Sequence, residues 1–320
     1  RDPAEQATWR SVLDNFISSR PNLPSSLTLA FRDLAKSSES DAGSLLDDLS
    51  VLSGDDALHG AHSAFRYRSV DDLLKELGIA EPQDIDIEAI AYYCGAIVKY
   101  SELESCAARI VGLNNRAVIS VGSTSTRGRQ RFSIAHELGH WMLDRGKTAH
   151  LCKESDLSAP WESRQDPESR ANEFAAELLM PRVMFKALAK DREVTFKTVE
   201  ELARMFQTSR TATAIRLIQL GSLPAMVVCH GNEGRRWFAR SAVLPSFIWP
   251  RAELSHETAA FDLLYGNVRQ SRPGLTNASK WISHRVAYKC NVIEDSIKIS
   301  DDAVLSLIWW KDRGQLVELQ

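Results

Sequence analysis

The sequence has few cysteines, no long apolar run and no secretion signal. No stretch approaches the ~18 consecutive apolar residues that a membrane helix needs, and no N-terminal stretch has the basic, apolar, small-residue order of a signal peptide. The five cysteines are odd in number, lie far apart and include no CxxC pair, which argues against a disulfide framework and a Cys-rich zinc site. These absences predict a protein of the reducing cytoplasm without a membrane segment.

The sequence also lacks a strong excess of charge of either sign. Residues 1–62 contain five Lys and Arg and ten Asp and Glu, a net charge of −5. Residues 63–220 contain 22 of each sign and have a net charge of zero. Residues 221–320 contain 12 basic and 10 acidic residues, a net charge of +2. A dedicated duplex-DNA-binding protein would carry a marked basic excess, so the charge disfavours that class.

The amino-acid composition is that of a folded protein. Apolar residues make up 44% and charged residues 25%, which excludes a disordered chain, a coiled coil and a collagen. A length of 320 residues corresponds to two or three domains, at roughly 100–200 residues per domain.

The first 62 residues are predicted to be an acidic helical segment. Trp9, Phe16 and Ile17 lie at helical spacing, but the segment is too short to bury much core alone. It is either a docking or dimerisation arm or a piece of another polypeptide joined to this chain. The chain begins with Arg1 rather than Met, which predicts that its natural start is missing or altered.

Two further domains, 63–220 and 221–320, follow from the pattern of helices and strands. Strand-like runs at 108–113 and 117–121 flank the hairpin signal Asn114-Asn115-Arg116, and helices are predicted at 130–144 and 166–180. Strands return at 225–229, 236–240 and 304–310, with helices near 256–265 and 277–282. The fold class is therefore α+β, with a C-terminal α/β domain.

The helix at 130–144 carries the HExxH motif His136-Glu137-Leu138-Gly139-His140. The i, i+4 spacing puts both imidazoles on one helix face, where they can bind one zinc ion. Glu137 beside the metal can take a proton from zinc-activated water and deliver it to the leaving amine. The alternative is an ordinary amphipathic helix with two solvated histidines.

The third ligand that a catalytic zinc needs is predicted to be Glu168. At 100° per residue, Glu168 shares the buried face of the helix at 166–180 with Ala171 and Ala175, and Asn172 lies at the edge of that face. A carboxylate on a buried face needs a partner, and zinc would be that partner. The alternative is an exposed Glu168 favoured by the helix dipole.

Residues 86–220 resemble the ImmA/IrrE family of metallopeptidases. Two motifs carry the resemblance: Arg131-Phe132-Ser133-Ile134-Ala135 leading into the HExxH motif, and Glu168 followed by Ala171-Asn172-Glu173-Phe174-Ala175-Ala176-Glu177-Leu178-Leu179-Met180-Pro181. The resemblance implies a zincin-like fold with a helical subdomain, zinc (Zn²⁺) held by His136, His140 and Glu168, and Glu137 as general base. It also implies an unusual substrate, a helix-turn-helix transcriptional repressor.

Residues 221–320 resemble the GAF-like sensor domain of a subset of this family. The runs that carry this resemblance are Arg235-Arg236-Trp237-Phe238 and Leu305-Ser306-Leu307-Ile308-Trp309-Trp310. The subset accompanies bacterial anti-phage (CBASS-type) operons, which implies that cleavage of the repressor switches on a defence operon after DNA damage, with single-stranded DNA as the trigger.

Two regulatory features are predicted from single residues. Cys106, just before the hairpin, is a candidate thiolate that fills the open zinc position and keeps the enzyme latent; the alternative is a small buried hydrophobe. Arg235, Arg236 and Trp237 combine charge and stacking surface for a nucleic acid or ligand, whereas the plainer interpretation is an edge strand with solvated arginines.

These features predict a regulated zinc endopeptidase that uses the hairpin edge to bind its substrate as an extra strand. One alternative is a non-catalytic sensor that binds the repressor or a ligand. Another is a transcription factor acting through residues 198–220, which resemble a helix-turn-helix but lack a cluster of Arg and Lys. No membrane partner is predicted, and no feature specifies an oligomeric state.

Overall fold

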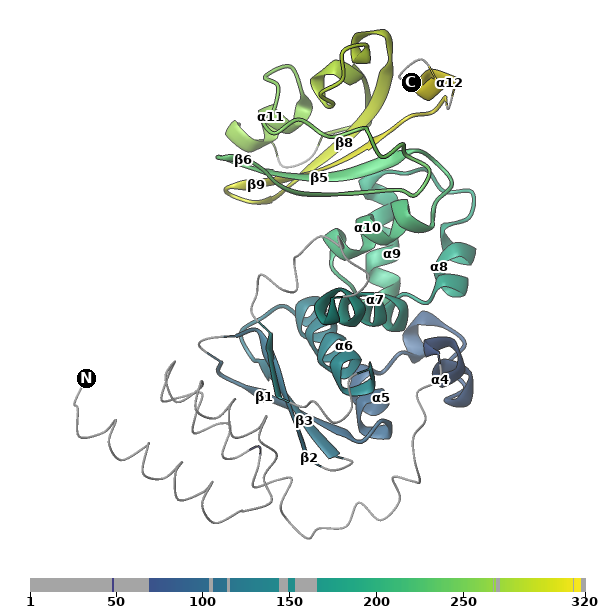
Figure 1. Ribbon diagram of the computed structural model, residues 1–320, viewed down its shortest axis with the longest axis vertical. Coiled ribbons are helices and arrows are strands. Elements are labelled where there is room, and N and C mark those ends of the chain that lie inside the picture. The colour runs from purple at the N-terminus through teal and green to yellow at the C-terminus, as the bar shows by residue number, and fades with distance from the viewer. Residues whose placement is uncertain are drawn as a thin grey trace, which may run out of the picture. The chain divides into compact units, whose positions relative to one another are not determined.

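The computed structural model describes residues 48, 69–103, 106–113, 116–143, 149–152, 166–266, 268, 271–312 and 314–317. The chain is a mixed α+β protein whose contacts divide it into two compact units, the first ending at Leu179 and the second beginning at Met180 (Figure 1). Within the described residues, none of the helices is long and apolar enough to span a membrane.

The first unit begins with two short helices that are capped by their own sequence. Helix α4 (Val70–Glu76) has a capping box at Ser69, and α5 (Ile87–Tyr93) has Asp86 as N-cap; a 3₁₀ turn, Pro82–Asp84, lies between them. Gly78 and Gly95 follow these helices with φ of 68° and 85°, a conformation that glycine adopts without strain.

A four-stranded sheet also belongs to the first unit. Its strands are β1 (Ala96–Ser101), β2 (Ala108–Leu113), β3 (Arg116–Gly122) and β4 (Ala149–Cys152), in the order β1-β3-β2-β4. Strands β2 and β3 form the predicted antiparallel hairpin, and β1 lies parallel to β3.

The expectation that the hairpin offers a free edge is wrong. Strand β2 pairs with β3 on one side and with β4 on the other, and β3 pairs with β1 and β2. Among the described strands, β4 is therefore the edge on that side of the sheet. The sequence did not indicate it because β4 has only four residues and follows a polar stretch.

Two helices of the first unit pack closely together. They are α6 (Arg127–Leu143), which contacts β2 and β3, and α7 (Pro167–Leu179). Gly139 of α6 permits the close approach, because a Cβ there would lie 3.1 Å from the Ala171 Cα and 3.2 Å from the Phe174 Cβ. Most of α6 from Arg131 onward is buried.

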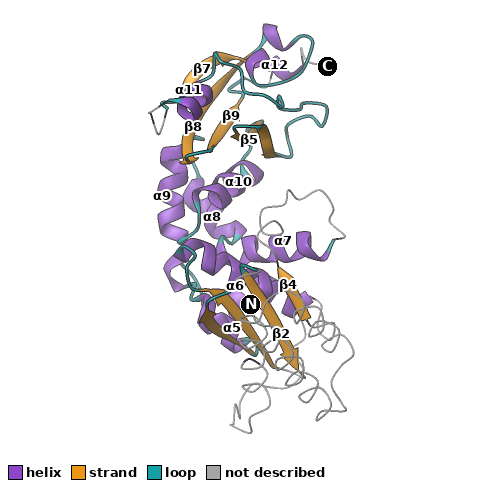
Figure 2. Ribbon diagram, turned by 90° about the vertical axis from the view of Figure 1, so that its left-hand side faces the viewer, coloured by secondary structure: helices purple, strands orange, loops and turns teal. Residues whose placement is uncertain are grey.

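The second unit contains a five-stranded antiparallel sheet. Its strands, in the order β6-β5-β9-β8-β7, are β5 (Ala225–Gly231), β6 (Gly234–Arg240), β7 (Gly274–Asn277), β8 (Asn291–Ser300) and β9 (Ala303–Trp309). Strands β5, β7, β8 and β9 of this sheet are labelled in Figure 2. Shorter helical elements accompany it: α11 (Ala259–Tyr265), Ala278–Lys280, Ala287–Lys289 and α12 (Gly314–Val317).

Three helices precede this sheet in the second unit. They are α8 (Arg182–Ala189), α9 (Phe196–Phe206) and α10 (Arg210–Leu220), and α9 and α10 contact β8 and β5, respectively. Ser209 caps α10 through its side chain, as its position in the sequence indicates. The helices expected to accompany the peptidase domain thus share a compact unit with the C-terminal strands.

Burial shifts the pKa of two side chains of the second unit toward their neutral forms. The pKa of Asp295 is raised to about 6 by burial, although the Phe196 amide donates a 2.7 Å hydrogen bond to its Oδ2. The pKa of His230 is lowered to about 4 by burial, and its Nε2 donates to the Arg251 carbonyl oxygen at 3.2 Å. Their contributions to stability therefore change with pH in opposite directions.

Candidate metal centre

Helix α6 places His136 and His140 on one face, one turn apart. Both side chains are buried, and their rings meet edge to face with centroids 4.7 Å apart. The two Nε2 atoms lie 3.1 Å from each other. The predicted pairing of the two imidazoles is therefore present in the fold.

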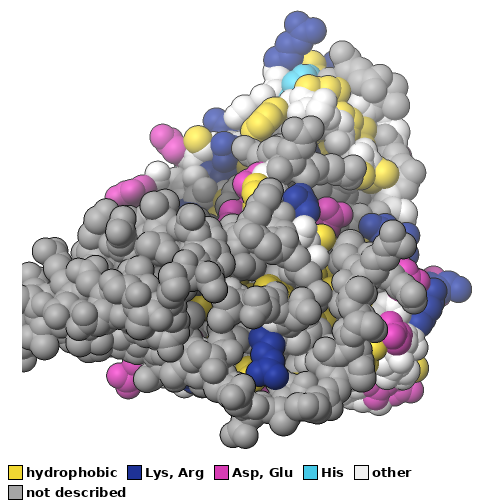
Figure 3. All heavy atoms as spheres, turned by 60° about the horizontal axis from the view of Figure 1, so that its bottom comes forward, with side chains coloured by type: hydrophobic (Ala, Val, Ile, Leu, Met, Phe, Trp, Pro, Cys, Tyr) yellow, Lys and Arg dark blue, Asp and Glu magenta, His cyan; other side chains and the backbone are white. Residues whose placement is uncertain are grey.

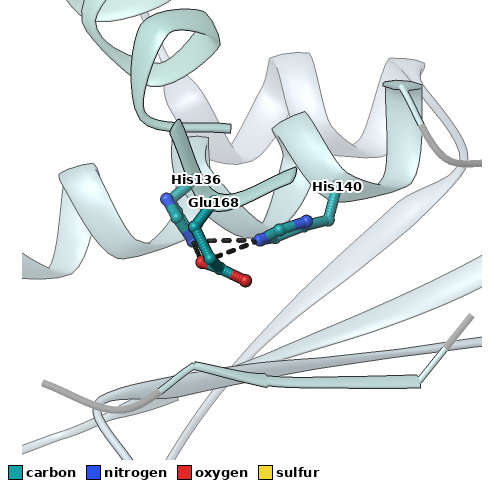
Figure 4. A group of neighbouring side chains, drawn as sticks. All are labelled: His136, His140 and Glu168. Atoms are coloured by element: carbon teal, nitrogen blue, oxygen red, sulfur yellow. Dashed lines mark hydrogen bonds and ion pairs between the residues drawn. The ribbon is translucent and has the colours of Figure 1, made fainter. Parts of the chain in front are cut away.

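Glu168 approaches the same point from the first turn of α7. Its Oε2 lies 3.1 Å from the His136 Nε2 and 3.4 Å from the His140 Nε2 (Figure 4). The structure thus brings together all three residues that the sequence indicated as ligands. Their ligand atoms lie within 4.8 Å of one another.

These separations fit a tetrahedral zinc site. With metal–ligand bonds of about 2.0–2.1 Å, two ligand atoms of a tetrahedral site lie about 3.3 Å apart. The three observed distances are 3.1, 3.1 and 3.4 Å. Two imidazoles and a carboxylate are also the ligands of a known class of catalytic zinc site.

Asn172 is a further member of this cluster, and the sequence did not predict its contact with His136. Its Oδ1 lies 2.9 Å from the Nδ1 of His136, and both side chains are buried. Because a carbonyl oxygen only accepts, Nδ1 is the donor, and the Nε2 of a neutral His136 carries its lone pair toward Glu168. The available signal was its spacing, since Asn172 follows Glu168 by four residues on α7.

The electrostatics of the cluster favour a cation at its centre. When a proton rather than a metal ion lies between these atoms, hydrogen bonds from His136 and then His140 hold the pKa of Glu168 well below its usual range, against the opposing effect of burial. A carboxylate and two imidazole nitrogens are electron-rich atoms that repel one another unless a proton or metal ion lies between them.

Glu137 lies next to His136 in α6, and its side chain is fully buried. A buried carboxylate beside a cluster of metal-ligating groups is suited to proton transfer.

Cys106 is half-buried and precedes β2, two residues before Ala108. Ala108 pairs with Val121 of β3 and with Cys152 of β4. Among the described residues, the cluster of ligand atoms comprises His136, His140 and Glu168 and does not include the Cys106 thiol.

Five side chains that follow the HExxH motif in the sequence could also bind a metal ion or orient a histidine, but the structure does not describe them. Asp144, Glu154 and Asp156 lie outside the described residues. His150 and Cys152 belong to β4, of which the structure describes the backbone.

Arg235, Arg236 and Trp237 lie on β6, an edge strand of the second sheet within the described residues. Arg235 donates to the Pro250 carbonyl oxygen, and its guanidinium lies 5.1 Å from the Phe238 ring centre. Arg236 forms an exposed ion pair with Asp302, and Trp237 is half-buried. The three residues thus have different surroundings.

A second group of basic and aromatic side chains lies beside them. Arg240 of β6 stacks over Trp249 at 5.6 Å, and Phe238 meets the same tryptophan edge to face at 5.2 Å. Trp249 and Phe247 are exposed. We call Arg235, Phe238, Arg240, Phe247 and Trp249 the aromatic–arginine surface. On the face drawn in Figure 3, by contrast, basic and acidic side chains of the described residues are interspersed.

Comparison with known proteins supports a family assignment for part of the chain. One similar solved structure is described as a Mycobacterium tuberculosis transcriptional regulator. The match has a TM-score of 0.51 at 16% sequence identity, and it covers 78% of this chain and 77% of the other chain. This likeness concerns the fold. No curated protein matches the chain. Residues 94–217 match a peptidase family model, the IrrE N-terminal-like domain. This segment contains the His-His-Glu cluster, and the match supports the ImmA/IrrE family of metallopeptidases.

Proposed function

We propose that the chain is a regulated zinc endopeptidase that cleaves a helix-turn-helix transcriptional repressor and so switches on a stress or anti-phage defence operon. The observation that carries the proposal is the cluster of His136, His140 and Glu168, whose ligand atoms have the separations of a tetrahedral site. The match of residues 94–217 to a peptidase family is independent support.

The three ligands have complementary roles. His136 and His140 supply neutral nitrogens from one rigid helix, and Glu168 supplies a negative charge from a second helix. Zinc bound there would polarise the scissile carbonyl and lower the pKa of a water molecule. Asn172 holds the ring of His136 in the orientation and tautomer that binding needs.

Glu137 is proposed as the general base and acid of the reaction. It would accept a proton from the attacking water and deliver it to the leaving amine, which are the two proton transfers of peptide hydrolysis. Its position next to a ligand histidine and its burial favour this role.

Strand β4 is the proposed binding edge for the substrate backbone. It contacts α6, and among the described strands it pairs with β2 alone. An extended peptide can add to such an edge through main-chain hydrogen bonds. The edge therefore replaces the hairpin as the candidate for substrate binding.

Regulation by single-stranded DNA is proposed for the second unit. The aromatic–arginine surface offers charge and stacking partners, the chemistry that binds single strands without reading their sequence. The solved structure described as a transcriptional regulator is compatible with a regulatory role.

The test uses the full chain, Zn²⁺ and the helix-turn-helix protein encoded beside its gene, with and without single-stranded DNA. Glu137→Gln is expected to retain zinc and repressor binding and to lose cleavage, whereas Glu173→Gln, an exposed carboxylate of α7, should cleave normally. Cleavage by Glu137→Gln at the wild-type rate would reject the assignment.

A non-catalytic sensor is the second candidate. In that case the wild-type chain would bind the repressor with zinc present but leave it intact under every condition, and Glu137→Gln would behave as the wild type. The presence of Glu137 weighs against this candidate, since a scaffold needs no general base.

A further inference from the structure

Three polar side chains form a row across the sheet of the first unit. Lys99 of β1 pairs in register with Ser120 of β3, which pairs with Arg109 of β2. Because side chains alternate along a strand, these three share one face of the sheet. The residues before them on β1 and β3, Val98 and Ile119, face the other way and are apolar.

Asp48 contacts all three members of this row. Its Oδ2 accepts hydrogen bonds from the Arg109 Nη2 at 2.9 Å and from the Ser120 hydroxyl at 2.6 Å, and its Oδ1 accepts from the Lys99 Nζ at 3.0 Å. Asp48, Arg109 and Ser120 are fully buried, whereas the Lys99 side chain is 33% exposed.

Because Arg109 is buried, it needs a counter-ion, whereas an arginine at the surface does not. A guanidinium enclosed in protein without a counter-ion is strongly unfavourable, because its lost hydration is not replaced. Arg109 cannot shed its charge, since arginine stays protonated in proteins. An acid must therefore lie on this face of the sheet, and Asp48 supplies such a carboxylate.

Asp48 comes from the acidic first 62 residues, outside the segment 94–217 that matches the peptidase family. It is separated from Arg109 by 61 positions in the chain and is helical. The contact is thus a long-range tertiary one between the N-terminal region and the sheet.

We propose that the Asp48 carboxylate anchors the N-terminal region to the first unit, on the face of the sheet that carries Lys99, Ser120 and Arg109, and that this unit needs the anchor for its stability. Of the two origins that the sequence left open, the docked arm is the one that this contact supports. The proposal concerns stability and does not depend on proteolysis.

A double-mutant cycle in the full-length chain tests the docking. Asp48→Leu removes the ion pair of the buried Arg109 with Asp48, and Arg109→Met removes one of the two cations that contact the buried Asp48. Each should lower the melting temperature of the first unit by roughly 10 °C. The double variant removes both buried charges, so it should recover at least half of the lost melting temperature. Lys99, which also contacts Asp48, keeps its access to solvent in this variant.

The control is Glu102→Gln, an exposed carboxylate of the same unit, which should change the melting temperature by less than about 1 °C. Hydrogen exchange should rise in β1, β2 and β3 of the single variants and stay unchanged in the second sheet. An Asp48→Leu variant as stable as the control, or two losses that simply add, would overturn the proposal.

If the single variants do not fold, hydrogen exchange on the unmodified protein tests the docking of Asp48 instead. A peptide containing Asp48 should be protected to a degree similar to that of β3. Complete exchange of that peptide within seconds, while β3 stays protected, would show that the segment is not docked.

Discussion

Replacing Asn172 by alanine should weaken the metal centre although it removes no ligand. In the wild-type protein the Asn172 Oδ1 accepts the Nδ1–H of His136 at 2.9 Å. Alanine leaves that buried N–H without its acceptor and frees the ring to rotate or change tautomer. The His136 Nε2 would then spend part of its time turned away from the site or protonated.

The magnitude follows from the burial of the pair. His136 is 0% and Asn172 is 3% exposed, so water replaces the lost acceptor poorly. An unsatisfied buried polar group costs roughly 1–3 kcal/mol. At 1.4 kcal/mol per factor of ten, zinc affinity should fall by about 10- to 100-fold.

The assay is competition for Zn²⁺ between the apo protein and a chromophoric chelator. Asn172→Asp restores an acceptor and adds negative charge, so its zinc affinity should equal or exceed that of the wild type. Glu173→Ala is the matched control, because Glu173 neighbours Asn172 on α7 but is exposed.

Zinc binding by Asn172→Ala within about twofold of the wild type would contradict this role of Asn172. Equal weakening of the alanine and aspartate variants would also contradict it, since a general packing defect would affect both. Thermal melting of the apo forms separates such a defect from a loss of metal affinity.

The remaining predictions concern packing, latency and pH. Gly139→Ala should push α7 from α6 and lower both zinc affinity and stability, because the new Cβ would lie 3.1 Å from the Ala171 Cα; unchanged zinc binding would contradict this. Cys106→Ala should raise basal cleavage if the thiolate blocks the zinc, and equal basal activity at matched zinc loading would remove the latch hypothesis. The Asp295 contribution to stability is lost as the pH rises through about 6, and that of His230 is lost as the pH falls from 6.5 toward about 4. Asp295→Asn should therefore stabilise the second unit near neutral pH, by up to roughly 3 kcal/mol, and steepen its loss of stability on acidification; denaturant unfolding at several pH values that shows an unchanged slope would refute this.

The elements that the sequence predicted well are those with strong local signals. The hairpin around residues 114–115 and the helices α6 and α7 were expected from apolar periodicity and turn residues, and they are present. Strand β8 was missed because Glu294 and Asp295 interrupt its apolar pattern. Both carboxylates are buried and accept hydrogen bonds from residues far away in the chain, Glu294 from the Ala260 amide and Asp295 from the Phe196 amide.

The sequence by itself predicted the three candidate ligands of the metal centre, because helical geometry relates positions on one helix without reference to the rest of the fold. His136 and His140 share a face by their spacing, and Glu168 lies on the buried face of its own helix. Only the tertiary structure decided that the two helices meet with these three atoms 3.1–3.4 Å apart. It likewise decided that β4 forms the edge of the sheet and that Asp48 lies against Arg109. Such contacts join segments far apart in the chain, and their register depends on the packing of the whole core, which no local pattern encodes.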